Sequence, residues 1–237
     1  MNILIKAQKE KKKIKNIINK YHKNNKKILK RFNILLDNYY RTSDKLHHKY
    51  SQKIFKKLYK NNFFLIKKKK QYYDKKYKQF LADRYVIGIC PFCNYKKTYS
   101  DQCLKCGNII ENKLKKPISI LSKTKPILKK TINFFIPFKK KKNEIIKIIN
   151  IFKKKMDKKI IKNMLNFLKT GLHNRSITRD IKWGIKLPIK EYKKKVIYVW
   201  FEAILGYITA TIKLEKKKKK IKWKLFWKNK KNKNKKK

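Results

Sequence analysis

Four cysteines within a short segment are the part of this sequence that points most directly to chemistry. They form two Cys-x-x-Cys pairs, Cys90 with Cys93 and Cys103 with Cys106, and nine residues separate the pairs. Each pair can turn two thiolates towards one point, so two facing pairs supply four sulfurs at about 2.3 Å from a zinc ion. Because four thiolates fill every coordination position, the sequence predicts one structural zinc site and not a catalytic one.

Other kinds of cysteine chemistry fit this pattern less well. Disulfides are typical of small secreted domains, whereas this chain has 237 residues and no signal peptide. A redox-active Cys-x-x-Cys does not need a second copy beside it. An iron–sulfur cluster stays open as an alternative, although its ligand spacings usually differ.

The chain is strongly basic, with 72 Lys and Arg against 13 Asp and Glu and a formal net charge of +59. Such a chain attracts polyanions, and the attraction depends strongly on salt. Only five of the 72 are Arg, the residue best suited to bidentate phosphate and base contacts. The abundant Lys, Asn, Ile, Phe and Tyr all have A/T-rich codons. We therefore interpret much of the lysine excess as mutational drift, with a selected nucleic-acid surface as the alternative.

The interval between residues 41 and 206 holds every Gly, every Pro and four of the five Arg, which indicates that it has resisted this drift. With 41% apolar and 13% aromatic residues, the chain can bury the core of one or two domains. No apolar run reaches the about 18 residues of a membrane span, and the N-terminus lacks the apolar segment of a signal peptide. We therefore expect a cytoplasmic protein with no membrane partner.

Hydrophobic periodicity predicts two helices before the cysteine block. Apolar residues within 8–30 recur at i, i+3, i+4 and i+7, the spacing of one helix face. A second helix is expected from about Ser43, as its N-cap, to Lys60. Its adjacent histidines, His47 and His48, are expected to face solvent.

Strands and loops are expected around the cysteine block. Short apolar runs predict strands at 63–66 and 84–89. Lysine runs predict loops at 67–70 and 139–142. Two further helices should follow, with Asp157 as the N-cap of the second and Gly171 as the left-handed residue after its end. Their apolar stripes are expected to be core, and consist of Ile145, Ile148, Ile149 and Phe152, then Ile161, Met164, Leu165 and Leu168.

The segment Val196–Phe201 is a nearly continuous apolar run rich in β-branched and aromatic residues. This composition predicts a strand buried on both faces, as in a parallel α/β sheet. The segment Ala203–Ile212 should then be a helix or a turn and a helix. Ala203 and Gly206 lie just past the expected strand end, where open α/β sheets bind ligands. The lysine runs 216–220 and 228–237 are expected to be disordered.

Five blocks of sequence match, in the same order, those of a known protein family. The first two blocks lie around Tyr21 and His22 and at Arg41–Ser43. The cysteine block follows from Phe80 to Gly107, and two further blocks lie at 175–184 and 195–208. The last contains the letters VWFEAILGY. In their residues and their order, these blocks, spread between about residues 5 and 230, resemble methionyl-tRNA synthetases of the archaeal and eukaryotic cytosolic type.

The resemblance implies an α/β fold, a partial Rossmann-type class I synthetase catalytic domain with a zinc-knuckle connective insertion. Residues 1–65 would belong to the first Rossmann half, and residues 66–170 to the connective insertion and the helices after it. Residues 171–237 would start the second Rossmann half. The implied activity is that of a methionine–tRNA ligase, which uses ATP to join methionine to its tRNA through a methionyl-adenylate. The implied partners are tRNA, L-methionine and ATP, with other fragments of a split synthetase as a further possibility.

The resemblance also implies a methionine pocket. Trp200, Ala203 and Tyr207 are similar to the aromatic and small residues that shape this pocket in the family, and aromatic faces hold a thioether well. From the residues alone, Trp200 and Tyr207 could equally be ordinary core aromatics. Arg179 and Asp180 lie in a motif near the family's active site, but the sequence assigns neither a role, and the catalytic residues stay unknown.

The sequence departs from the family pattern at several positions. Where members often carry a second knuckle of four cysteines, this chain has Asp74, Tyr77, Ser119 and Ser122, so we expect that knuckle to have lost its zinc. Glu202 replaces a shorter Asp, and Ile204 replaces a smaller or cyclic residue. Both changes are expected to affect the shape of the pocket.

Neither ATP motif of the family, of the His-Ile-Gly-His and Lys-Met-Ser-Lys-Ser types, occurs in the sequence. Without groups that stabilise charge on the transferring phosphate, adenylation loses most of its catalysis. We therefore expect the isolated chain not to activate methionine, and methionine-dependent ATP–pyrophosphate exchange by the folded chain would contradict this. A zinc-stabilised, lysine-rich RNA-binding remnant without catalysis and a decayed gene product are the alternative interpretations.

Overall fold

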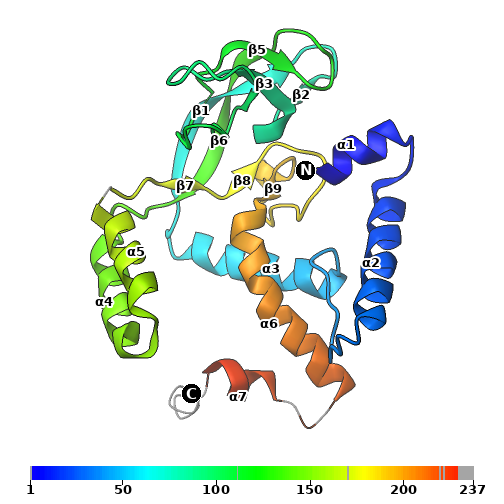
Figure 1. Ribbon diagram of the computed structural model, residues 1–237, viewed down its shortest axis with the longest axis vertical. Coiled ribbons are helices and arrows are strands. Elements are labelled where there is room, and N and C mark those ends of the chain that lie inside the picture. Colours follow the sequence, from blue (N-terminus) through cyan, green and yellow to red (C-terminus); the bar gives the residue numbers. More distant parts are fainter. Residues whose placement is uncertain (1, 111, 170, 219, 221, 229–237) are drawn as a thin grey trace. The chain divides into compact units, whose positions relative to one another are not determined.

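The computed structural model describes residues 2–110, 112–169, 171–218, 220 and 222–228 (Figure 1). The chain divides into two compact units. The first consists of the described residues of 1–54, 183–186 and 199–237, and the second consists of those of 55–182 and 187–198. Among the described residues, the first unit is helical and the second contains the strands.

The helices of the first unit come from both ends of the chain. They are α1 (Asn2–Lys9), α2 (Ile14–Arg31), the first part of α3 (Lys45–Lys60), α6 (Val199–Lys217) and α7 (Trp223–Lys228). The single helix expected over 8–30 is wrong at its start, because a break separates α1 from α2. Lys11 adopts a left-handed backbone conformation there, with φ of 51°, which a continuous right-handed helix does not allow.

Helix α3 begins one residue later than the sequence indicates. The Asp44 side chain, and not that of Ser43, accepts the hydrogen bond from the backbone N–H of Leu46 at 2.8 Å. This is the N-cap interaction that satisfies a free amide at the start of a helix. Both residue types are good caps, so the sequence locates this helix start to within one position.

The predicted buried strand 196–201 is wrong for most of its length. Only Val196 and Ile197 form a strand, β9, and α6 begins at Val199. The apolar residues that follow belong to a helix with one buried and one exposed face. The helix expected for 203–212 is confirmed, and it extends to Lys217, so the expected disorder at residues 216 and 217 is also wrong. The run 229–237 lies outside the described residues.

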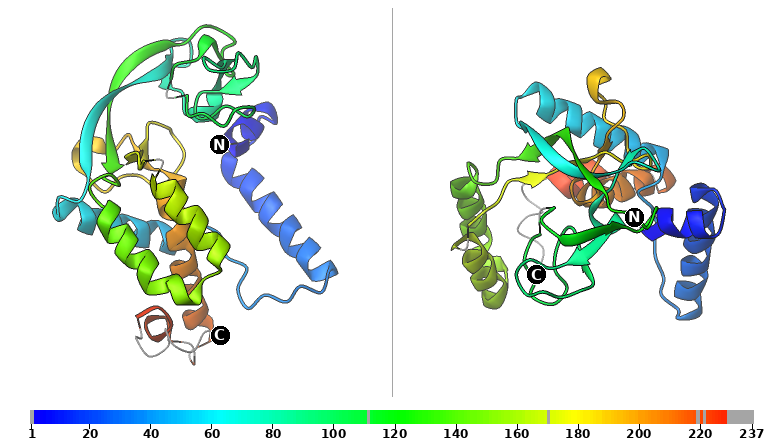
Figure 2. Two further views of the ribbon diagram at one scale, coloured as in Figure 1. Left: turned by 60° about the vertical axis from the view of Figure 1, so that its left-hand side comes forward. Right: turned by 90° about the horizontal axis from the view of Figure 1, so that it is seen from above.

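The second unit is built on a long antiparallel pair, β1 (Leu65–Asp74) with β6 (Ile127–Ile136). In Figure 2 these two strands curve together over their full length. Short strands β2 (Gln79–Phe80) and β7 (Arg175–Ser176) complete a sheet of order β2-β1-β6-β7. The lysine run 67–70, expected as a loop, lies inside β1, because the ladder binds its backbone while its side chains reach water.

A second sheet of order β4-β3-β5 carries the cysteine segment. Its strands are β3 (Val86–Ile89), β4 (Thr98–Tyr99) and β5 (Lys115–Ser119). Gly88 is required where β3 passes β5, because a Cβ at this position would lie 2.7 Å from the carbonyl oxygen of Lys115. The last pair, β8 (Thr178–Arg179) with β9 (Val196–Ile197), is antiparallel like every other strand pairing among the described residues.

Helices α4 (Lys142–Phe152) and α5 (Lys158–Lys169) follow β6. Asp157 caps α5, accepting the backbone N–H of Lys159 at 2.7 Å, and Gly171 has φ of 94°; both predictions are confirmed. Residues 139–141 form a turn, and Lys142 already belongs to α4. Short 3-10 helices complete the chain at Asp83–Tyr85, Lys153–Lys155 and Lys190–Tyr192.

Two apolar cores stabilise the second unit. Phe55, Phe64 and Phe134 form one, with ring centroids 4.8 to 6.1 Å apart. The other lies between α4 and α5 and consists of Ile149, Ile161, Leu168 and Leu172. Three residues expected in the helix stripes are outside it: Ile148, Phe152 and Met164 are 55%, 38% and 37% exposed. Together the two units make a mixed α/β chain.

Candidate metal centre and α6 binding face

The four cysteines lie together in the second unit. Their sulfur atoms all lie within 4.8 Å of one another, with 3.8 Å between Cys90 and Cys106 and 3.6 Å between Cys93 and Cys103. Four sulfurs about 2.3 Å from one ion are about 3.8 Å apart in a tetrahedron. The residues therefore fit a four-thiolate metal site of the expected kind.

Two turns of the same design present these sulfurs. In the first, the Asn94 N–H donates to the Cys90 carbonyl at 3.1 Å, and in the second, the Gly107 N–H donates to the Cys103 carbonyl at 3.0 Å. Asn94 and Gly107 each follow their Cys-x-x-Cys and each have positive φ, 55° and 71°. These are the residue types that tolerate the left-handed conformation, and they let each turn direct both thiols inward.

Backbone N–H donors approach two of the four sulfurs and favour their thiolate forms, whereas burial and the neighbouring thiols raise the pKa of Cys93 to about 12. The N–H groups of Phe92 and Lys105 donate to Cys90 and Cys103, each at 3.4 Å. Burial would raise the pKa of Cys103, but hydrogen bonds from the Cys106 backbone and from Thr98 outweigh it and lower that pKa to about 6. A thiol with this pKa is deprotonated at neutral pH, as a metal ligand must be.

The positions of the missing second knuckle are also brought together, but by hydrogen bonds. The buried carboxylate of Asp74 accepts from the Ser119 hydroxyl at 2.5 Å and from the Tyr77 backbone N–H at 3.0 Å. The Ser122 N–H lies 3.4 Å from the Ser119 oxygen. The Ser119 and Ser122 hydroxyls lower the pKa of Asp74 against the opposing effect of burial. One carboxylate thus connects the end of β1 to the end of β5.

The three residues expected to shape a methionine pocket share one face of α6. Trp200 and Tyr207 are 74% and 71% exposed, and Ala203 lies between them and is partly buried. Ile204 belongs to the same face and is 65% exposed. The interpretation of Trp200 and Tyr207 as core aromatics is therefore wrong, because each presents most of its surface outward.

The opposite face of α6 is buried against α3 in the first unit. Glu202 and Thr209 point there, and both contact His47, which is fully buried. The His47 Nε2 lies 2.5 Å from the Glu202 carboxylate, and its Nδ1 lies 2.9 Å from the Thr209 hydroxyl. The expectation that His47 faces solvent is wrong, because its side chain is fully buried between α3 and α6, two helices whose ribbons cross in Figure 1.

Sequence analysis therefore missed His47 and treated Glu202 only as a departure from the family pattern. A signal was present in the spacing, since Glu202 and Thr209 are seven residues apart on a helix and so share a face. A partner for two polar groups on a buried face must itself be polar. Nothing in the sequence says that this partner is His47 and not His48, which is only partly buried.

Arg179 and Asp180 take part in separate interactions in the second unit. The Arg179 guanidinium lies 3.8 Å from the ring centroid of Tyr198 and donates to the Thr178 carbonyl at 2.9 Å. Asp180 forms an ion pair with the buried ammonium of Lys195, and the Thr131 hydroxyl joins both, 2.7 Å from Lys195 and 3.0 Å from Asp180. These contacts fix both side chains without assigning either a chemical role.

Among the residues that the structure describes, no helix is both long enough and apolar enough to cross a membrane.

Comparisons with known proteins place this chain in one family. The family model for class I tRNA synthetases (M) matches residues 1–236. A methionine–tRNA ligase of Borrelia duttonii is 42% identical over 216 residues, which are 90% of this chain and 29% of that protein. One from Bacteroides fragilis is 37% identical over 228 residues, 96% of this chain and 33% of that protein. The chain thus spans about a third of the length of these relatives.

Solved structures agree on the fold. Mycobacterium tuberculosis methionyl-tRNA synthetase, in complex with methionyl-adenylate, is similar with a TM-score of 0.60 and 16% identity, covering 88% of this chain and 36% of that one. With the family match over nearly all residues, this similarity identifies the fold as that of a class I synthetase catalytic region. The chain belongs to the methionyl-tRNA synthetase family.

Proposed function

We propose that this chain is part of a methionine–tRNA ligase, an enzyme that joins methionine to tRNA through a methionyl-adenylate at the expense of ATP. The substrates would be L-methionine, ATP and a methionine-accepting tRNA. In this proposal residues 1–65 belong to the first Rossmann half, 66–170 to the connective insertion with its helices, and 171–237 to the start of the second half.

The observation that carries the proposal is the outward face of α6, in a chain that matches this family over residues 1–236. Trp200, Ala203 and Tyr207 are the residues to which the family resemblance gives the methionine pocket, and they lie on one accessible face. With the exposed Ile204 between them, the two aromatic residues form a contiguous apolar patch, and such patches often mark binding sites.

The chemistry of this face suits a thioether. The indole of Trp200 and the phenol of Tyr207 offer polarisable faces to the methionine sulfur, a contact worth about 0.3–1.5 kcal/mol. The small Ala203 leaves space between them, where a larger side chain would fill the volume that the substrate needs. The chain's residues would bind and orient the amino acid in this way.

We further propose that the four cysteines hold one structural zinc ion. Cys90, Cys93, Cys103 and Cys106 fit a tetrahedral ion, and four thiolates leave no position for a substrate or water. When bound, the ion would connect the two turns through its coordination bonds to the four thiolates. Its contribution would be to the stability of the β3-β4-β5 region.

The ATP-handling groups would come from elsewhere in the enzyme. The relatives are about three times as long as the region that they share with this chain. We propose that the remaining parts, on the same polypeptide or on other fragments of a split synthetase, complete the site with the α6 face. Methionine-dependent ATP–pyrophosphate exchange by the assembled parts, and its loss when this chain is omitted, tests this.

Binding of L-methionine to the chain tests the proposed role of α6. We expect calorimetric titration to show binding of L-methionine that is tighter than binding of norleucine, its sulfur-free analogue, by about 0.3–1.5 kcal/mol. Trp200→Ala should abolish binding, while Trp223→Ala, the same change on α7, should leave it intact. Equal affinity of the parent and the Trp200→Ala variant would refute the assignment of this face.

A further inference from the structure

We propose that His47 is a positioning residue that sets the rotation and axial position of α6, and thereby the presentation of Trp200 and Tyr207. The inference rests on the proposed methionine-binding role of α6. It concerns a different face of that helix and a residue on another helix. His47, Glu202 and Thr209 all belong to the first unit.

The geometry of the contact is that of a clamp. Glu202 and Thr209 are seven residues apart, so they lie about 10 Å apart along the helix axis. The imidazole of His47 lies between them, with Nε2 2.5 Å from the Glu202 carboxylate and Nδ1 2.9 Å from the Thr209 hydroxyl. Two bonds to points two turns apart oppose both rotation and sliding of α6, which a single contact would not.

The neighbours of the Thr209 hydroxyl determine whether it donates to or accepts from the His47 ring. The Thr209 hydroxyl lies 3.2 Å from the carbonyl oxygens of Leu205 and Gly206, which can only accept. The hydroxyl therefore donates to the helix backbone and accepts from the Nδ1–H of His47. The Nε2 atom then faces both the Glu202 carboxylate at 2.5 Å and the Ser51 hydroxyl at 3.4 Å.

Burial makes the clamp selective for these three residues. His47 and Thr209 are fully buried and Glu202 is 8% exposed, so water cannot replace a lost partner. Removing one member leaves its partner with one hydrogen bond fewer in a buried site, which is costly. The extra methylene of Glu202 relative to Asp gives its carboxylate a longer reach towards the ring.

The clamp lies opposite the binding face. At 100° per residue, Glu202 and Thr209 point about 140–180° away from Trp200 and Tyr207 on the helix. A slip of one residue on the buried side would therefore turn both aromatic rings away from their positions by about 100°. Soft sulfur–aromatic contacts need a defined ring orientation, so the buried side of α6 determines what the exposed side can bind.

Substitutions at His47 and Glu202, with one control at His48, test the clamp. The background carries Trp183→Phe, Trp223→Phe and Trp227→Phe, so that Trp200 is the sole tryptophan. His47→Phe keeps the volume and removes both hydrogen bonds, and His48→Phe is the matched control on the next residue. Glu202→Leu breaks the bond to Nε2. Glu202→Gln should preserve a hydrogen bond to Nε2, because its side-chain amide offers both an N–H donor and an oxygen acceptor.

Two readouts separate positioning from general stability. We expect His47→Phe and Glu202→Leu to lower the fluorescence anisotropy of Trp200 and to speed amide hydrogen exchange in α6. We also expect them to weaken L-methionine binding by roughly tenfold to a hundredfold, the scale of a misplacement of about 1 Å. The His48→Phe and Glu202→Gln variants should match the parent, and the zinc content of all variants should be equal.

The outcomes are distinguishable from those of the proposed function. If the parent does not bind methionine, the binding role of α6 fails, while Trp200 anisotropy and α6 exchange still decide whether the clamp exists. If His47→Phe and His48→Phe give the same anisotropy and exchange, the clamp is overturned. Should His47→Phe not fold, the isosteric Thr209→Val, which removes one bond, takes its place under the same criteria.

Discussion

Cys103 differs from the other cysteines in the number of donors that approach its sulfur. The Lys105 N–H at 3.4 Å and the Thr98 hydroxyl at 3.2 Å both point to it, and its pKa is lowered to about 6. These donors belong to the protein itself, so the fold stabilises part of the negative charge that a metal ligand requires. A thiolate that is already formed releases no proton when the metal binds.

Zinc stoichiometry follows from these residues. We expect one zinc ion per chain by atomic absorption, and Cys103→Ser to reduce it to near zero because a hydroxyl is a poor zinc ligand. Ser122→Ala, a change near Asp74, should leave the ratio at one. A ratio near two in the parent would show that the Asp74 region also holds metal. Chelation should unfold the β3-β4-β5 region and affect α6 less.

The Asp74 carboxylate makes stability depend on pH in a defined direction. Its folded pKa is lowered, so its stabilisation is fully present above the unfolded value of about 3.9 and is lost as pH falls through the folded pKa. At neutral pH, Asp74→Ala should cost about 1–3 kcal/mol, because the Ser119 hydroxyl and the Tyr77 N–H lose their acceptor in a buried site.

Urea denaturation of the parent and the Asp74→Ala variant at a series of pH values measures this. The difference between their free energies of unfolding should be constant at neutral pH and shrink below about pH 4. The exposed Asp37→Ala is the control, since this carboxylate is 66% exposed beside Lys218. A difference that grows towards acid pH would contradict the hydrogen-bond account.

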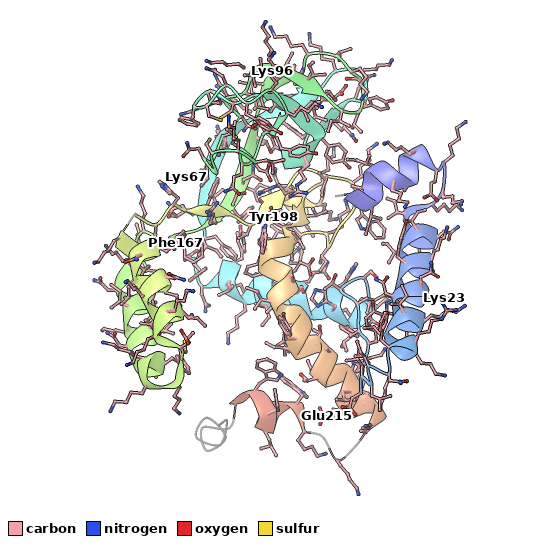
Figure 3. The ribbon with its side chains drawn as sticks, viewed as in Figure 1. Lys23, Lys67, Lys96, Phe167, Tyr198 and Glu215 are labelled. Carbon is pink, nitrogen blue, oxygen red and sulfur yellow. The ribbon has the colours of Figure 1, made fainter. Side chains whose placement is uncertain are left out.

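At the scale of elements, strand β1 shows that a run of like charges does not reliably predict a loop. The run 67–70 suggested a repelling loop, yet each of its residues pairs with β6, including Lys70 opposite Lys130. Like charges directly opposite one another destabilise a sheet, but the ladder hydrogen bonds and the apolar ends of both strands outweigh this. Figure 3 shows Lys67 on β1 and Lys23 on α2, both of which are solvent-exposed.

The close approach of β3 and β5 predicts a strong effect of a single methyl group. A Cβ at Gly88 would lie 2.7 Å from the Lys115 carbonyl oxygen, so Gly88→Ala must separate the strands and should destabilise the chain by about 1–3 kcal/mol. At Gly206 on α6, the nearest atom would be a Thr42 methyl at 3.4 Å, and Gly206→Ala should change stability little. Thermal denaturation compares the two, and equal midpoints would contradict the steric argument.

Local signals of sequence predicted some elements and not others. The cap at Asp157, the glycine after α5 and the cysteine turns follow from chemistry within a few residues, and the structure confirms them. The segment 196–201 failed because its apolar residues cover two faces that belong to different elements, a strand of two residues and then a helix. Composition cannot separate a buried strand from a helix over so short a run.

The functional residues also divide into those that the sequence predicts and those that only the structure reveals. The four cysteines could be named because their spacing alone defines a site, and the α6 face because it resembles a family. His47 could not, because its importance comes from Glu202 and Thr209, which lie more than 150 residues further along the chain. Pairing over such a distance is a property of the fold, which periodicity and capping do not reveal.

On the scale of the whole molecule, the net charge of +59 should make binding to any nucleic acid depend strongly on salt. We expect the logarithm of the association constant to fall linearly with the logarithm of salt concentration, for tRNA and for duplex DNA of equal length. If the proposed ligase function is correct, the chain should bind tRNA more tightly than duplex DNA, and this preference should persist when salt is raised.

Fluorescence polarisation with labelled tRNA and duplex DNA across a salt series measures both slopes. Lysines in excess through mutational drift would give equal affinities for the two polyanions, since charge alone does not distinguish them. Equal affinities at every salt concentration would remove tRNA from the list of specific partners and leave the lysines as generic charge.

The hydrogen-bonded contact of Asp74 with Ser119 bears on the order in which this chain can fold as it is synthesised. A four-cysteine turn has to wait for an ion before its two halves are held together, and several unpaired thiols are open to oxidation meanwhile. The hydrogen bond between Asp74 and Ser119 needs no ion, and it can form as soon as Ser119 has been synthesised. The ends of β1 and β5 can therefore be joined before any metal is captured, and the two cysteine turns between them would already be close to one another when the proposed ion binds.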